Sequence, residues 1–338
     1  MYENFAGTIV LHQDDVGMCH GANTAFKELS KLGSITSGSV MVPCPWFAEA
    51  ASMAAADSSL DLGVHLTLTA EKQFYRWRPL SNATKSSGLV DDEGYMWRDV
   101  TSVRKNANVE AVNLELRAQL DFALASGFDV THLDAHMGAT FAPEFCSIYI
   151  ALGVEYRLPI LITKKLSLYG PNNHIVGVSD EQFDEFVKSA QANNLPIFDR
   201  VLETNFSRPA KTELADDAYQ QMFTRDTTGL TFAALHPNAP GEVEVIEPDQ
   251  FHVRTREYEI FRSANYLKWI SEKKVKPIGM REIRDRMRSA ISANELSLFE
   301  TCSEMPKLFV ISFVAIKTVA AVAAKKTGNV QTPTRSKN

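Results

Sequence analysis

Histidine and aspartate side chains in four short stretches carry the chemistry that this sequence offers. Imidazoles and carboxylates bind divalent cations, and both groups transfer protons near neutral pH. Two imidazoles with one carboxylate suit a catalytic Zn²⁺ that keeps open positions for water and substrate, whereas Mg²⁺ prefers oxygen ligands. The four stretches are QDD (13–15), GVHL (63–66), THLDAHMG (131–138) and LHPN (235–238).

The stretch THLDAHMG admits two interpretations. In a helix, His132 and His136 would share one face, because they are four residues apart. In a strand that runs on into a loop, His132, Asp134 and His136 share a face by alternation, with His136 nearest the end. The apolar pattern around DVTHLD favours the strand. We therefore expect His136 to be a metal ligand, His132 to pack inward or support the site, and Asp134 to lie next to the metal or the substrate.

Asp14 and Asp15 follow a short apolar run and have two possible roles. Adjacent acids at this position can simply cap the next helix. On an extended chain, however, neighbouring side chains point in opposite directions, so one carboxylate can bind a metal while the other acts as a base. The residues alone leave open which aspartate is which. Gly17 and Gly21 allow the following loop to turn sharply.

Three further residues complete the candidate set. His65 lies on the strand face opposite a row of aliphatic residues, and Gly63 on the same face leaves room for a ligand or a close backbone. His236 is a candidate general acid, because Pro237 restricts its backbone and fixes the direction of its imidazole. Arg157 is a weaker candidate for substrate contact, and a solvated surface arginine is the competing interpretation.

Apolar runs of strand length alternate with segments of helical periodicity along the chain. Such alternation predicts right-handed crossovers and a parallel sheet. Eight units favour an α/β fold of the irregular (β/α) barrel type over a doubly wound open sheet. The polar stretches follow predicted strands, and the carboxyl ends of barrel strands hold the active site. The predicted strands are 8–13, 35–42, 60–69, 129–134, 158–163, 197–203, 230–235 and 275–279, and the predicted helices are 23–33, 45–56, 109–127, 143–153, 179–194, 212–226, 251–274 and 280–290.

One catalytic domain over residues 1–290, with an insertion at about 70–108, is the simplest organisation of the 338 residues. The net charge of −6 argues against nucleic acid as a partner. The four cysteines form no CxxC pair and the N-terminus has no signal-like pattern, which indicates a reducing, cytoplasmic compartment. In the tail, 291–338, the apolar stretch Leu308–Ala324 is interrupted by Lys317, so a docked or peripheral tail is favoured over a membrane anchor.

The motifs QDDVGMCHGAN, DLGVHLTLT, THLDAHMG and ALHP, in this order, resemble the YdjC-like carbohydrate deacetylases, the family of chitooligosaccharide deacetylase and the hopanoid-biosynthesis deacetylase. The resemblance covers about residues 7–288. It implies an irregular (β/α) barrel related to the NodB-type polysaccharide deacetylases, with a divalent metal, Zn²⁺ or Mg²⁺. Carried over motif by motif, the metal ligands are Asp15, His65 and His136, with Asp14 as general base and His236 as general acid.

The reaction that this resemblance implies is removal of an acetyl group from an N-acetylated carbohydrate or glycolipid, and a homodimer is a compatible assembly. Where many members have a run of histidines after THLD, this chain has AHMGAT, with Met137, Gly138 and Thr140. A hydrolase of a glycosidic or phosphate ester bond is the second hypothesis. A non-catalytic carbohydrate-binding or membrane-associated homologue is the third.

Overall fold

The computed structural model describes residues 5, 7–170, 174–207 and 214–303. The chain divides into two compact units, Met1–Arg288 and Ser289–Asn338. The predicted apolar stretch Leu308–Ala324 lies outside the described residues. Within the described part, none of the helices has the length and apolar character needed to cross a membrane. The first unit contains every predicted site residue.

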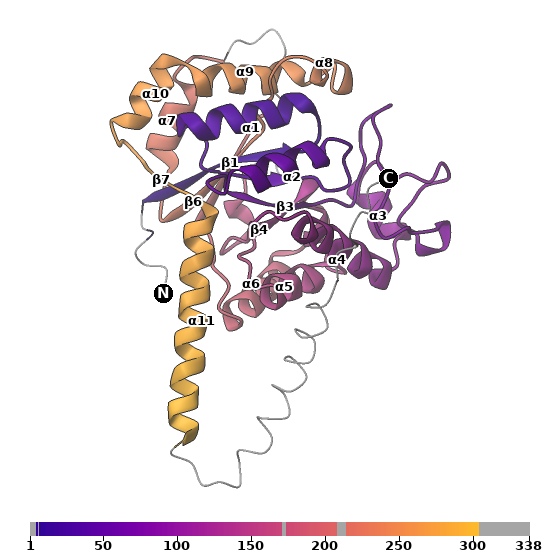
Figure 1. Ribbon diagram of the computed structural model, residues 1–338. Helices are drawn as coiled ribbons and strands as arrows, with labels where there is room; N and C mark the ends of the chain where they lie inside the picture. The colour runs from indigo at the N-terminus through magenta and orange to yellow at the C-terminus, as the bar shows by residue number, and fades with distance from the viewer. Residues whose placement is uncertain (1–4, 6, 171–173, 208–213, 304–338) are drawn as a thin grey trace, which may run out of the picture. The chain divides into compact units, whose positions relative to one another are not determined.

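Parallel strands form one sheet in this unit, in the order β4-β3-β2-β1-β6-β5, with β7 beside the start of β1 (Figure 1). All pairings are parallel, as the alternation of strands and helices predicted. The central strands are buried on both faces. β3 and β6 are accordingly mainly apolar, whereas β2 carries two buried serines. The strands are β1 (Thr8–Val16), β2 (Ser37–Val40), β3 (Leu62–Leu66), β4 (Val130–Ala135), β5 (Arg200–Glu203), β6 (Leu230–Leu235) and β7 (Lys276–Ile278).

The strand predicted at 158–163 is wrong, so the described residues form seven strands rather than eight. This segment makes two isolated parallel bridges, one to Leu133 of β4 and one to Phe198 just before β5. Pro159 has no N–H group and cannot donate to a ladder, which explains why a regular strand does not form. Leu161 still donates to the Leu133 carbonyl oxygen at 3.0 Å. The segment thus bridges the β4 and β5 edges and gives the barrel its irregular character.

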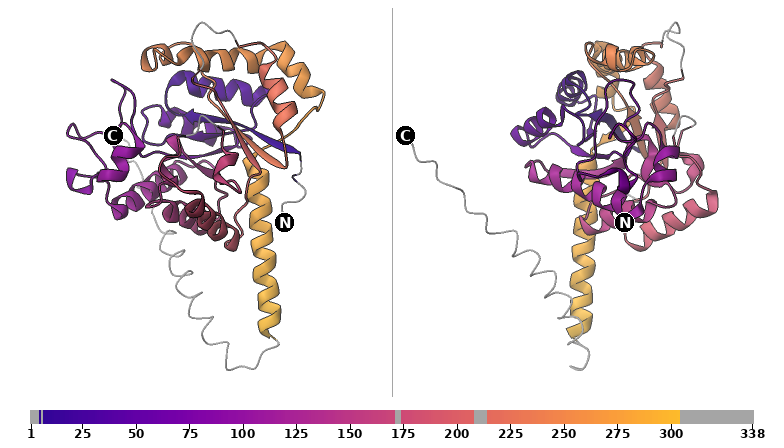
Figure 2. Two further views of the ribbon diagram at one scale, coloured as in Figure 1. Left: turned by 180° about the vertical axis from the view of Figure 1, so that it is seen from behind. Right: turned by 90° about the vertical axis from the view of Figure 1, so that its right-hand side faces the viewer.

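Helices cover both sides of this sheet. α1 and α9 pack side by side on one side, and α4, α5 and α6 lie on the other (Figures 1 and 2). α6 begins with a capping box, in which Ser179 and Gln182 exchange reciprocal hydrogen bonds. The single helix predicted over 251–274 is two helices, because Ser263 is extended and its side chain caps the second one. The helices are α1 (His20–Leu32), α2 (Phe47–Ala56), α3 (Val100–Asn106), α4 (Val109–Ala125), α5 (Cys146–Glu155), α6 (Asp180–Ala192), α7 (Ala218–Asp226), α8 (Val243–Ile246), α9 (Phe251–Arg262), α10 (Ala264–Ser271), α11 (Met280–Ser303) and the short η2 (Lys85–Ser87), η3 (His136–Phe141) and η4 (Leu166–Leu168).

The insertion at about 70–108 packs onto the barrel near the carboxyl ends of the strands. An antiparallel bridge joins Val90 and Met96 within the insertion. Trp77 is buried in an apolar cluster with Met96 and Val243 of α8, and its indole N–H donates to a backbone carbonyl oxygen at 2.9 Å. This anchoring fixes the first residues of the insertion, which reach the candidate site.

Candidate metal and catalytic site

A cavity of about 590 Å³ opens at the carboxyl ends of the strands, where the sequence placed the chemistry. Its titratable lining comes from β1, β3, β5, α9, the start of the insertion, the turns after β4 and β6, and the loop before α6. The charged or titratable lining residues are Asp14, Asp15, His65, Glu71, Lys72, His136, His174, Glu203, His236 and Arg254, and the larger apolar ones are Met137, Phe141, Leu161, Tyr169, Ile175, Val201 and Phe206.

Asp15, His65 and His136 converge on one point in this cavity. Asp15 Oδ1 lies 3.2 Å from His136 Nδ1 and 3.5 Å from His65 Nε2. All three residues are buried. Asp15 adopts a left-handed backbone conformation with φ of 60°, where the pairing of β1 with β2 shifts register. Such a conformation is costly for a residue other than glycine, and here it aims the carboxylate at the two histidines.

The three residues fit a divalent cation. Their ligand atoms all lie within 4.8 Å of one another. Asp15 Oδ1 is buried and accepts no hydrogen bond within the described part of the chain, as expected of an oxygen that serves a cation. Each imidazole presents its other nitrogen to an outer carboxylate: His65 Nδ1 lies 2.8 Å from Asp134 Oδ1, and His136 Nε2 lies 3.1 Å from both oxygens of Glu71. Carboxylate-supported histidines are characteristic of metal sites.

The charges around this centre favour the ionised forms of its groups. Burial opposes ionisation of His136, but the carboxylates of Glu71 and Asp15 outweigh it and raise its pKa to about 10. At His65, burial alone would lower the pKa. The Asp134 carboxylate outweighs burial, so the pKa of His65 is raised. Against the cost of burial, the Arg254 guanidinium and His136 hold the pKa of Asp15 well below its usual range. Carboxylates therefore alternate with positively charged histidine and arginine side chains around the centre.

Arg254 and Glu71 belong to this array although the sequence analysis did not single them out. Arg254 Nη1 lies 2.8 Å from Asp15 Oδ2, and the same guanidinium donates twice to Glu247, at 2.7 and 2.9 Å. Lys72 Nζ lies 2.5 Å from Glu247 and 3.2 Å from Glu71. Arg254 comes from a helix and Glu71 from the insertion. A search confined to strand ends therefore could not find them.

Asp14 faces the other side of the cavity, toward His236. Asp14 Oδ2 lies 3.5 Å from His236 Nε2. His236 Nδ1 lies 3.0 Å from Thr204 Oγ1, whose hydroxyl donates to Glu257 Oε1 at 2.7 Å. Because that hydroxyl proton goes to Glu257, Thr204 accepts from His236, which leaves the lone pair of Nε2 directed toward Asp14. Glu257 also accepts the His236 backbone N–H at 2.6 Å, so two bonds hold the histidine in place.

A buried polar floor lies beneath the cavity. His12 Nε2 is 3.1 Å from Asp134 Oδ2 and 3.3 Å from Asp14 Oδ1, and the Ser39 hydroxyl donates to Asp134 at 2.8 Å. His132 packs edge-on against His12, with ring centroids 4.9 Å apart. His12 and Ser39 were missed, although strand alternation places His12 and Asp14 on one face. The space left by Gly63 is filled by the His132 ring, since a Cβ there would lie 2.5 Å from it.

The two histidines of THLDAHMG thus lie in different elements. His132 is within β4, and His136 begins η3 immediately after that strand ends. Met137 and Gly138 both have positive φ, at 53° and 61°, which breaks any continuous helix through the stretch. Arg157 is exposed in the turn after α5 and is absent from the described lining of the cavity. The strand interpretation holds, and the helical face does not form.

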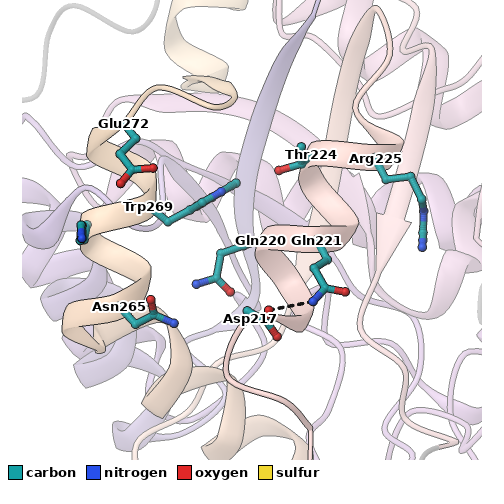
Figure 3. A pocket seen from close by; sticks show the side chains of 9 residues that line it. Asp217, Gln220, Gln221, Thr224, Arg225, Asn265, Trp269 and Glu272 are labelled. Atoms are coloured by element: carbon teal, nitrogen blue, oxygen red, sulfur yellow. Dashed lines mark hydrogen bonds between the residues drawn. The ribbon is translucent and has the colours of Figure 1, made fainter.

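A second cavity, also about 590 Å³, lies between α7 and α10 (Figure 3). Gln221 of α7 donates to Asp217 at 2.7 Å, the bond marked in Figure 3, and Trp269 of α10 projects toward α7. None of the predicted site residues lies in its described lining, which is Asp217, Gln220, Gln221, Thr224, Arg225, Asn265, Lys268, Trp269 and Glu272. The candidate chemistry is therefore in the cavity at the strand ends.

Comparisons with known proteins agree with this architecture. A family model described as YdjC-like protein matches residues 8–272. A carbohydrate deacetylase of Thermus thermophilus is 38% identical over 162 residues, which are 48% of this chain and 56% of that protein. A carbohydrate deacetylase of Clostridium beijerinckii is 25% identical over 81% of this chain and 99% of that protein. A chitooligosaccharide deacetylase of Yersinia enterocolitica is 27% identical over 46% of this chain and 59% of that protein.

Several of these matches are partial. The first three curated relatives are matched over 56%, 60% and 58% of their own length. A solved structure from Enterococcus faecalis, described as a candidate cellobiose-phosphate cleavage protein, has a TM-score of 0.64 at 21% identity and covers 82% of this chain and 98% of its own. This last likeness concerns the fold alone.

Proposed function

Because the chain belongs to the YdjC-like family, we propose that it hydrolyses the amide bond of an N-acetylated sugar or glycoconjugate with the help of a divalent metal ion. The observation that carries the proposal is the convergence of Asp15, His65 and His136 on one point beside the Asp14–His236 pair. The names of the relatives, carbohydrate and chitooligosaccharide deacetylases, support the same class of substrate.

Asp15, His65 and His136 would hold the ion. Two imidazoles and one carboxylate form a donor set more natural for Zn²⁺ than for Mg²⁺. A bound divalent ion lowers the pKa of water and polarises a carbonyl oxygen, which are the two effects that amide hydrolysis needs. Asp134 and Glu71 keep the supporting protons on the outer nitrogens of the two histidines, so that His65 Nε2 and His136 Nδ1 present lone pairs to the ion.

Asp14 and His236 would move the protons. Asp14 takes one proton from the attacking water, and His236 Nε2 donates one to the departing sugar nitrogen. The products are acetate and a free amino sugar. Burial raises the pKa of Asp14 well above its usual range, and burial lowers the pKa of His236 well below its usual range. The raised pKa of Asp14 favours its role as proton acceptor, and the lowered pKa of His236 makes it a ready donor once its Nε2 carries a proton. The two side chains lie 3.5 Å apart.

An acetate-release assay on the full-length protein tests this function. The protein is incubated with N-acetylated chitooligosaccharides and with an N-acetylated glycolipid, before and after treatment with a chelator. We expect acetate release that the chelator abolishes and that added Zn²⁺ restores. Release of phosphate or of new reducing ends without acetate would instead support cleavage of another bond. Binding of the sugars without any product would support a non-catalytic protein.

A further inference from the structure

Glu203 is a half-buried residue whose carboxylate lies in the cavity, and the proposed mechanism has no use for it. It is the last residue of β5 and lines the cavity. Its Oε2 atom is buried and has no hydrogen-bond partner within the described ranges. Burial raises the pKa of Glu203 to about 7. A buried carboxylate without partners lowers stability, and such groups are kept where a ligand satisfies them.

The surroundings of Glu203 show where its carboxylate lies. Val201 shares its strand face by alternation and also lines the cavity. The next residue, Thr204, bonds to His236, so Glu203 is one residue away from the support of the candidate general acid. On the far side, a Cβ on Gly170 would lie 2.9 Å from Glu203 Oε2, so the backbone closes the space behind the carboxylate. Among the described residues, Gly170 leaves no room for a partner behind the carboxylate, so the cavity is the side from which a ligand can reach it.

We propose that Glu203 binds the sugar ring of the substrate by accepting hydrogen bonds from its hydroxyl groups, and so positions the acetamido group beside Asp14 and His236. Hydroxyl groups are the donors that a sugar offers, and the neighbouring Val201 and Phe206 provide apolar contact for its C–H groups. Glu203 belongs to none of the clusters with metal-ligand spacing in the described part of the chain, which separates it from the metal centre. The inference rests on the proposed function, since that function supplies the sugar.

The test compares the wild type with Glu203→Gln, which keeps the side-chain volume but removes the charge and half of the acceptor capacity. With di-N-acetylchitobiose as substrate, we expect KM to rise about tenfold, the loss typical of one charge-assisted hydrogen bond, while kcat stays within about twofold. Glu185→Gln on α6 removes the same charge at an exposed position and should leave both constants unchanged. An unchanged KM in the Glu203 variant would overturn the inference.

Thermal unfolding separates this positioning role from a structural one. Because Glu203 Oε2 has no partner, the Gln variant should unfold at the same or a higher temperature than the wild type. A lower unfolding temperature together with a fall in kcat would show a structural role instead. If the wild type released no acetate, the proposed function would fail, but calorimetric binding of di-N-acetylchitobiose would still test Glu203. About tenfold weaker binding by the variant supports the inference, and equal or undetectable binding to both proteins overturns it.

Discussion

Both carboxylate oxygens of Glu71 lie 3.1 Å from His136 Nε2, on the side of the ring away from Asp15. Asp134 stands in the same relation to His65, 2.8 Å from its Nδ1. The two histidines therefore use opposite ring nitrogens toward the cavity, and a separate carboxylate fixes each ring. One of these carboxylates comes from a neighbouring strand and the other from the insertion.

Removing the outer carboxylate of His136 should weaken metal binding without abolishing it. For Glu71→Gln we expect the affinity for Zn²⁺ to fall about 10–100-fold, because the amide no longer fixes the tautomer or raises the basicity of the ring. Competition against a chromophoric chelator measures this change. Asp92→Asn, a fully exposed acid in the same insertion, is the control and should bind Zn²⁺ like the wild type. Equal affinities for all three proteins would contradict the supporting role of Glu71.

Removing a ligand should have a larger effect. We expect His136→Ala to lose most of its metal, whereas the wild type carries about one divalent ion per chain, as one three-ligand site requires. Elemental analysis of the purified proteins gives the stoichiometry. The exposed His20, which pairs with Glu49 on the surface, provides the control variant His20→Ala. Full metal content in His136→Ala would remove His136 from the ligand set.

Substitutions of the two adjacent aspartates should have different effects on metal content and on kcat. Asp15→Asn is expected to lose the metal, because its Oδ1 faces both histidines. Asp14→Asn is expected to keep the metal and lose about 10²–10⁴-fold in kcat, the contribution of a general base. Metal content and acetate release are measured on the same preparations. Loss of metal from Asp14→Asn but not from Asp15→Asn would exchange the two assignments.

The stability of the metal-free protein should depend on His136 at alkaline pH. Its pKa is about 10 in the folded chain and ~6.5 when unfolded. A raised folded-state pKa means that the folded chain binds the extra proton, so this contribution is complete below ~6.5 and is lost as pH rises through about 10. Between these two pH values, the free energy of unfolding measured with urea should fall more steeply with rising pH for the wild type than for His136→Gln. Parallel declines would contradict the Glu71–His136 charge pairing.

Arg254 should be far more important for stability than a neighbouring surface arginine. Replacing it with Met takes the guanidinium away from the buried carboxylates of Glu247 and Asp15, which keep only Lys72 and the site histidines beside them. We expect a loss of about 3–5 kcal/mol in the free energy of unfolding. Arg256→Met, two residues along the same helix, removes a partly exposed pair with Asp216 and should cost at most about 1 kcal/mol. Urea titrations of metal-free proteins compare the two. Equal losses would show that the buried pairing contributes little.

Local patterns in the sequence predicted the parallel α/β order of the fold and most residues of the candidate site. Strand alternation and the apolar runs are local properties, and they placed Asp14, Asp15, His65 and His236 at or near strand ends. The same local pattern predicted a strand through DVTHLD, and β4 confirms it. The prediction failed at 158–163, where the segment makes two isolated bridges in place of a regular strand and Pro159 lacks an N–H group to donate.

Local patterns could not predict which side chains surround the candidate ligands. Arg254, Glu71 and Glu257 come from helices or from the insertion, and their positions depend on packing between segments far apart in the sequence. No local sequence pattern indicates that an arginine in a helix will pair with an aspartate at the end of a strand. The long-range pairings also set the pKa directions at the site, because burial and neighbouring charge exist only once the chain has folded.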